Sequence, residues 1–185
     1  MTEIGLFAYD GVDAHVLVAV HDVLVAARSD CDLEATVYSL VPSDGVTAAS
    51  GIELVPDDVL IGTPDVVVVP GGWTDADRQT TTYPEDLPER LEHLAEGGAT
   101  VVGVGAGVLA VAESGLLEDA AAATVDGHRA PLADLADEVV DAPVVEDGDV
   151  ITAAGPANAS DLAVRLVEST CGETVAADVR GAFGR

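Results

Sequence analysis

The sequence contains no lysine, few basic residues and no long apolar run. Seven arginines stand against 34 acidic residues, which gives a net charge of −27. Binding to phosphates requires a cationic patch that seven scattered arginines do not form, so we expect no nucleic-acid partner. The longest apolar stretch, residues 101–112, is interrupted by three glycines and is too short for a membrane helix. We therefore expect no membrane association.

Cysteine and histidine are also scarce. Cys31 and Cys171 lie far apart and match no metal-binding or redox spacing, so we expect two separate structural thiols in a reducing cytoplasm. The histidines show no metal-ligand spacing, and we expect no metal site and no cofactor. The first residues lack the basic flank of a signal peptide and lead directly into an apolar strand, which also favours the cytoplasm.

The acidic residues accompany a large apolar fraction. Hydrophobic residues make up 49% of the chain, so this is not a disordered acidic segment. We expect a folded core beneath a very acidic surface. Its best explanation is adaptation to multimolar salt, because at about 1 M the Debye length falls to roughly 3 Å and self-repulsion is screened. An ordinary acidic protein is the alternative.

Apolar strand patterns alternate with helical patterns along the whole chain. Strands are predicted at residues 4–9, 33–40, 66–69, 100–104 and 150–153, with extended or hairpin structure over 46–60. Helices are predicted around 16–24, 84–95, 108–113, 158–169 and 175–183. This alternation predicts one α/β domain over residues 1–185, a three-layer sandwich in which helices flank a mostly parallel sheet.

Ligands of such sheets bind beyond the carboxyl ends of the strands. Gly71, Gly72 and Trp73 follow one predicted strand, and Gly105 and Ala106 follow another. Glycines there allow backbone N–H groups to face a common point, as in an oxyanion hole, although a simple tight turn would use the same residues. The G-x-G-x-G run at 103–107 differs from the dinucleotide-binding spacing G-x-G-x-x-G.

Five segments together resemble the ThiJ/PfpI family of the class I glutamine amidotransferase-like superfamily, especially its isonitrile-hydratase-like branch. They are residues 9–24, 64–72, 109–117, 147–155 and 161–168, in the family's order. The resemblance implies a flavodoxin-like fold, a homodimer, and an oxyanion hole from the amides of Gly71, Gly72 and Ala106. It implies that Asp22 stands at the position of a glutamate that contacts the family's nucleophile.

The resemblance also implies the loss of that nucleophile. The family has a cysteine at a sharp strand-to-helix turn, the nucleophile elbow, and this position falls at Gly105, which has no side chain. The family's histidine falls at Val125, and an aspartate of the hydratase members falls at Val16. Cysteine-dependent hydrolase, glyoxalase or deglycase activity is therefore not expected.

Two functions remain open at this stage. The first is a non-catalytic member that binds a small molecule or anion at the Gly71, Gly72 and Ala106 amides, with Trp73 and His128 as further contacts. The alternative is a hydratase or lyase, isonitrile-hydratase-like or glyoxalase-like, in which Asp22 acts as acid and base without a covalent intermediate. The structural alternative is that the Asp22 carboxylate is hydrogen-bonded to backbone amides and that His128 is an exposed loop residue.

Overall fold

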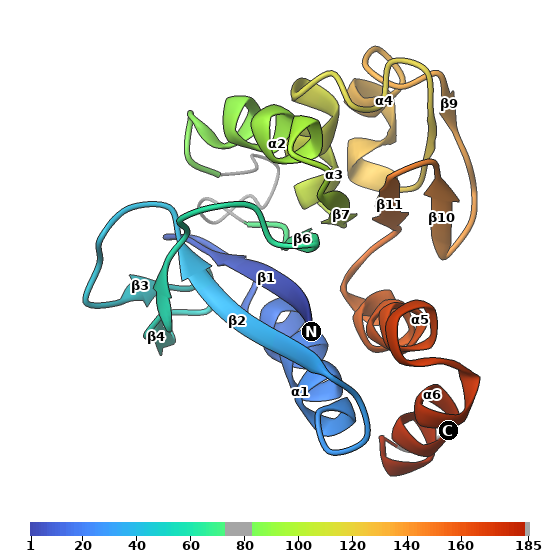
Figure 1. The fold of residues 1–185 in the computed structure, drawn as a ribbon. Helices are drawn as coiled ribbons and strands as arrows, with labels where there is room; N and C mark the ends of the chain where they lie inside the picture. Colours follow the sequence, from blue (N-terminus) through green and yellow to red (C-terminus); the bar gives the residue numbers. More distant parts are fainter. Residues whose placement is uncertain (73–82, 184–185) are drawn as a thin grey trace.

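A seven-stranded sheet forms the centre of the molecule and confirms the predicted α/β class (Figure 1). The computed structural model describes residues 1–72 and 83–183. The strand order is β10-β11-β7-β6-β1-β2-β5, and all neighbours are parallel except β10 and β11. These strands are β1 Thr2–Ala8, β2 Leu33–Ser39, β5 Asp58–Val59, β6 Val66–Val69, β7 Thr100–Val104, β10 Val144–Asp147 and β11 Val150–Ala153.

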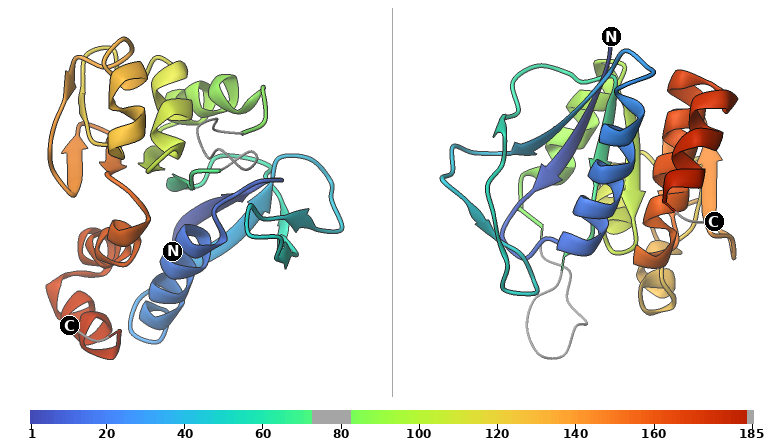
Figure 2. Two further views of the ribbon diagram at one scale, coloured as in Figure 1. Left: turned by 180° about the vertical axis from the view of Figure 1, so that it is seen from behind. Right: turned by 90° about the horizontal axis from the view of Figure 1, so that it is seen from below.

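Helices cover both faces of this sheet (Figures 1 and 2). One layer contains α1, α5 and α6, which pack against one another, and the other contains α2, α3 and α4. The helices are α1 Ala14–Ala27, α2 Leu87–Glu96, α3 Gly107–Glu113, α4 Arg129–Leu132, α5 Ala159–Cys171 and α6 Glu173–Ala182, with short 3₁₀ turns η1 Asp126–His128 and η2 Pro156–Asn158.

The central strands are apolar on both sides because each side faces a helical layer. In β6, Val68 packs toward α1 and α5, whereas Val67 and Val69 pack toward α2 and α3. In β7, Val102 likewise packs toward α1 and α5, and Val101 packs toward α2 and α3. This two-sided burial explains why the predicted strands are continuous apolar runs rather than alternating ones.

Two small two-stranded sheets lie outside the main sheet. The antiparallel pair β3 Val46–Thr47 and β4 Glu53–Leu54 confirms the hairpin expected within residues 46–60. The parallel pair β8 Ala121–Ala122 and β9 Glu138–Val139 has no counterpart in the prediction, and neither does β10. These elements were missed because they are short or lie at the edge of a sheet, where no apolar run marks them.

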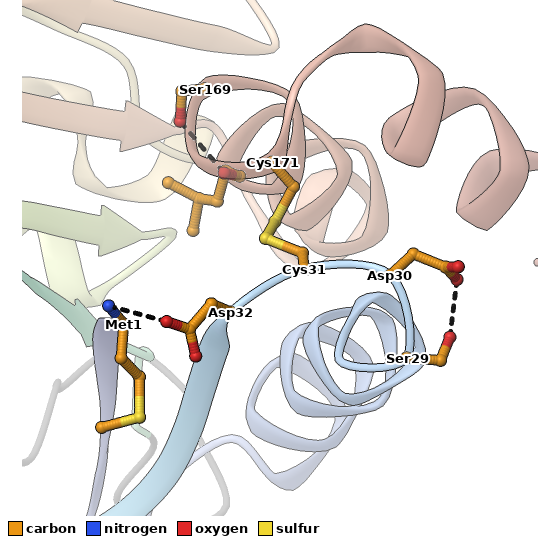
Figure 3. The surroundings of a disulfide bond; sticks show 8 residues. Met1, Ser29, Asp30, Cys31, Asp32, Ser169 and Cys171 are labelled. Carbon is orange, nitrogen blue, oxygen red and sulfur yellow. Dashed lines mark hydrogen bonds and ion pairs between the residues drawn. A yellow bond between two sulfur atoms is a disulfide. The ribbon is translucent and has the colours of Figure 1, made fainter.

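The two cysteines form a disulfide, so the prediction of separate thiols is wrong (Figure 3). Cys31 lies in the connection from α1 to β2, and Cys171 is the last residue of α5. Their Cα atoms are 5.5 Å apart, within the range that a disulfide needs. The pairing arises because α1 and α5 lie side by side, a proximity that sequence separation does not reveal.

The core of the described chain contains few polar groups. Its buried polar residues are Ser39, Thr124, His128 and Thr152, so no described carboxylate is buried. Among the described helices, none combines the length and apolar composition that crossing a bilayer would require.

Candidate functional site

Four adjacent parallel strands, β1, β6, β7 and β11, place the residues that follow them at one edge of the sheet. Tyr9 follows β1, and Gly71 and Gly72 follow Pro70 at the end of β6. Gly105 follows β7, and Gly155 lies just beyond β11. This is the edge at which open α/β sheets bind ligands. The sequence-predicted glycines are therefore brought together.

Gly105 occupies a sharp turn between β7 and α3. Its φ of +58° lies in the left-handed region that favours glycine. Two hydrogen bonds hold the turn, from the Gly105 N–H to the Ala153 carbonyl at 2.9 Å and from the Thr124 hydroxyl to the Gly105 carbonyl at 2.7 Å. A Cβ atom at this position would meet Gly155 Cα at 3.5 Å and Pro156 Cδ at 3.7 Å, which are ordinary contacts. The turn thus has the shape of an elbow, and the described residues around it leave room for a Cβ atom that glycine does not supply.

Close approach of β6 and α3 requires glycine at two further positions. A Cβ atom on Gly107 would lie 2.2 Å from the Val69 carbonyl oxygen. A Cβ atom on Gly71 would lie 3.0 Å from the Ala106 Cβ and 3.1 Å from the Ala106 nitrogen. Gly71 therefore lies directly against the Ala106 amide, as an oxyanion hole requires.

The backbone amides of Gly71, Gly72 and Ala106, here called the amide cradle, are available for a ligand. All three residues are buried. Within residues 1–72 and 83–183, none of the three N–H groups donates a hydrogen bond. Buried N–H groups are almost always paired in folded proteins. The cradle is thus a place where a carbonyl or anionic oxygen of a ligand would supply acceptors that residues 1–72 and 83–183 do not.

Two hydrogen bonds fix the peptide groups that precede the cradle amides. The Tyr9 hydroxyl donates to the Pro70 carbonyl at 2.6 Å, in a buried position. The Asp13 N–H donates to the Gly71 carbonyl at 2.7 Å. Asp13 also caps α1, because its side chain accepts from the His15 and Val16 amides.

Comparison with known proteins agrees with this architecture. The model of the DJ-1/PfpI family matches residues 3–169. The chain belongs to the DJ-1/PfpI family. Protein DJ-1alpha of Drosophila melanogaster is 28% identical over 153 residues, which cover 80% of this chain and 70% of that protein.

Solved structures share the fold of this DJ-1/PfpI chain over nearly its whole length. The crystal structure of Drosophila melanogaster DJ-1beta has a TM-score of 0.85 at 22% identity, covering 98% of this chain and 97% of that one. An AraC family transcriptional regulator from Pseudomonas putida has a TM-score of 0.85 at 25% identity, with complete coverage of both chains.

Asp22 does not reach the site of this DJ-1/PfpI chain, so the expectation that it faces the elbow is wrong. It lies nine residues beyond the N-cap of α1, which places it about 13 Å further along the helix axis. Its side chain is 60% exposed and lies 3.9 Å from the His21 Nδ1. The buried face of α1 is formed by Val16, Val20 and Val23, and this periodicity turns Asp22 to solvent.

The other predicted site residues have different outcomes. Val125 lies beside Gly155, whose added Cβ would approach the Val125 Cγ1 to 2.8 Å. His128 is buried in η1, and burial lowers its pKa, so the imidazole is neutral at pH 7. Its role as a ligand contact stays a prediction. Trp73 lies outside the described residues.

The site was incompletely predicted from sequence. Tyr9 and Asp13 were missed, although Tyr9 ends the first predicted strand and Asp13 follows it closely, where polar residues near a ligand are expected. Across residues 1–72 and 83–183, no group of three or more His, Cys, Asp or Glu side chains is arranged to hold a metal ion.

Proposed function

We propose that this DJ-1/PfpI chain binds a small molecule through a carbonyl or anionic oxygen at the amide cradle, and that it does not perform cysteine-dependent catalysis. The observation that supports binding is the set of three buried N–H groups without an acceptor among the described residues. Backbone donors of this kind bind oxygen without a charged side chain. That property suits a chain whose net charge is −27, because cationic side chains are scarce.

The cysteines support the non-catalytic part of the proposal. A nucleophilic cysteine must be a thiolate, and both cysteines of this chain are joined in a disulfide. That bond lies past the C-terminal end of α1, whereas the cradle contacts its N-cap. The 14 residues of α1 separate the two ends by about 20 Å. Neither sulfur reaches the elbow, where we propose that Gly105 occupies the family's cysteine position.

The alternative of a hydratase or lyase loses its proposed acid and base. Asp22 is exposed on the outer face of α1 and does not face the elbow. Binding without turnover is therefore the function that we propose.

Two probes test the binding proposal, because they present the two kinds of oxygen. Acetamide and acetate are titrated into ¹⁵N-labelled protein in 2 M KCl while amide resonances are followed. We expect saturable shifts concentrated at Gly71, Gly72 and Ala106 with at least one probe. Gly71→Ala should abolish them, because its Cβ would lie 3.1 Å from the Ala106 nitrogen. Gly181→Ala is the matched control, since no described atom lies within 4 Å of its added Cβ. Unchanged cradle resonances with both probes would contradict binding.

Turnover assays test the non-catalytic part. Methylglyoxal and a simple isonitrile are incubated with the protein in multimolar KCl, and consumption of each is followed. We expect no turnover above that of Gly71→Ala. Turnover that survives Cys31→Ser and Cys171→Ser but is lost in Gly71→Ala would show an enzyme that works without a thiol.

The cellular setting is part of the same proposal. The absence of lysine and the charge of −27 support a protein of a salt-accumulating organism, because salt screens self-repulsion. The disulfide removes the argument for a reducing cytoplasm that rested on free thiols. Its unfolding temperature should rise steeply between 0.2 and 2 M KCl; an unfolding temperature indifferent to KCl argues for an ordinary acidic protein. The family resemblance supports a homodimer, which light scattering after size exclusion in 2 M KCl will test.

A further inference from the structure

The hydroxyl of Tyr9 is placed against the backbone of the cradle rather than toward solvent. Tyr9 is 4% exposed and lies directly after β1. Pro70 follows β6, the neighbouring parallel strand. The Tyr9 hydroxyl donates to the Pro70 carbonyl at 2.6 Å across this junction. A buried tyrosine needs a partner for its hydroxyl, and here the partner is the carbonyl of the peptide that carries the Gly71 N–H.

This hydrogen bond determines where the Gly71 N–H points. The described part of the chain has no cis peptide bond, so the carbonyl and N–H of each peptide group point in opposite directions. Holding the Pro70 carbonyl toward Tyr9 therefore turns the Gly71 N–H to the other side. The Asp13 N–H does the same for the next peptide by holding the Gly71 carbonyl at 2.7 Å, which orients the Gly72 N–H.

The surroundings of the hydroxyl keep it a donor. Burial raises the pKa of Tyr9 well above its usual range, and the nearby Tyr83 and Asp13 raise it further. The hydroxyl thus keeps its proton under all ordinary conditions. Two hydrogen bonds hold the peptide groups of the cradle. The donor of one is the Tyr9 side chain, which a substitution by Phe removes, and the donor of the other is the Asp13 backbone N–H, which that substitution leaves in place.

We infer that Tyr9 is a positioning residue of this protein: its hydroxyl holds the Pro70–Gly71 peptide so that the Gly71 N–H faces the bound oxygen of a ligand. This inference rests on the proposed function for its ligand, but not for its geometry. Tyr9 itself touches no ligand in this arrangement. Its removal should therefore weaken binding only through the Gly71 amide.

Tyr9→Phe tests the inference, and Tyr38→Phe is its matched control. Tyr38, on β2, also donates its hydroxyl to another residue. Its acceptor is the Glu3 carboxylate near the start of β1, whereas the cradle lies beyond the ends of the strands. In ligand-free protein, Tyr9→Phe should shift the Gly71 amide resonance and speed its hydrogen exchange, while Gly72, held by Asp13, changes less. Affinity for the acetamide or acetate probe should fall about fivefold, as expected for one lost hydrogen bond. Tyr38→Phe should change neither readout.

The two readouts separate failure of this inference from failure of the proposed function. An unchanged Gly71 resonance and unchanged affinity in Tyr9→Phe would overturn the positioning role. If the wild type binds neither probe but Tyr9→Phe still shifts Gly71 selectively, the positioning role holds and the binding proposal fails. If Gly71, Gly72 and distant amides all shift equally, Tyr9 is a general packing residue and the inference is overturned.

Discussion

Opening the disulfide between Cys31 and Cys171 should destabilise the fold strongly. The bond closes a loop of 140 residues in the unfolded chain. The loss of unfolded-state entropy for a loop of this length corresponds to about 5 kcal/mol at 25 °C. That is comparable with the total stability of a typical domain, about 5–15 kcal/mol. The paired Cys31→Ser and Cys171→Ser variant should therefore unfold at a much lower urea concentration than the oxidised protein.

The position of the bond predicts which part of the molecule loosens first. Cys171 ends α5, and α6 begins two residues later, at Glu173. Without the bond, the end of α5 and α6 are held mainly by their packing against α1 and against each other, among the elements that the structure describes. Hydrogen exchange should accelerate in α6 and in the α1–β2 connection before it accelerates in β6 and β7.

The assay is urea unfolding in 2 M KCl, followed by circular dichroism, for three samples. These are the oxidised protein, the protein with reductant, and the double serine variant. The reduced protein and the variant should agree within about 1 kcal/mol, because both lack the same cross-link. Equal stability of all three samples, with the oxidised sample shown by mass to contain the bond, would refute the reasoning.

Four further predictions follow from the geometry of single residues. Gly107→Ala should cost about 3 kcal/mol or prevent folding, because its Cβ would lie 2.2 Å from the Val69 carbonyl oxygen; a urea midpoint like that of the wild type would contradict this contact. Gly105→Ala should cost only about 1 kcal/mol, the strain of a left-handed backbone, since the nearest described atom lies 3.5 Å from its Cβ. Burial and the hydrogen bond to Glu3 raise the pKa of Tyr38 to about 12. The stability that the neutral phenol contributes should therefore be present below about pH 10 and lost as the pH rises toward 12. The stability of Tyr38→Phe should not show this alkaline loss. Burial lowers the pKa of His128, so the stability that its neutral imidazole contributes should be present above about pH 6.5 and lost as the pH falls through its folded pKa. Imidazole NMR resonances that show His128 protonated at pH 6.5 would contradict its burial.

The fold was predictable because its strongest signals are local. The valines of residues 66–69 and the apolar run at 100–104 have no helical periodicity, and they became the two central strands β6 and β7. Helix α2 was readable from Leu87, Leu91 and Leu94, which repeat at helical spacing and are all buried. The edge strand β10 could not be predicted from the sequence, because its residues are half-buried or exposed and its pattern resembles that of a loop.

The candidate site was only partly predictable for the opposite reason. The glycines at 71, 72 and 105 follow apolar strands, and the topology of a parallel sheet brings such positions together. The direction of Asp22 depends on the rotation of α1 about its axis, which the buried residues Val20 and Val23 determine. The disulfide depends on two helix ends meeting in space, and the clamp by Tyr9 depends on a contact between β1 and β6. The disulfide and the Tyr9 contact leave no mark in the spacing of residues along the chain, whereas the apolar spacing of Val16, Val20 and Val23 does indicate that Asp22 faces outward.

The bare elbow has a consequence for protein engineering. Its backbone is held by groups outside the turn, namely the Ala153 carbonyl, the Thr124 hydroxyl and the close packing of Gly107 on Val69. The turn should therefore persist when residue 105 carries a side chain, at the cost of the strain of a left-handed backbone, about 1 kcal/mol. A small side chain introduced at position 105 would stand next to the three N–H groups of the amide cradle. The chain offers a scaffold in which the reactive group and the oxygen-binding backbone are supplied independently.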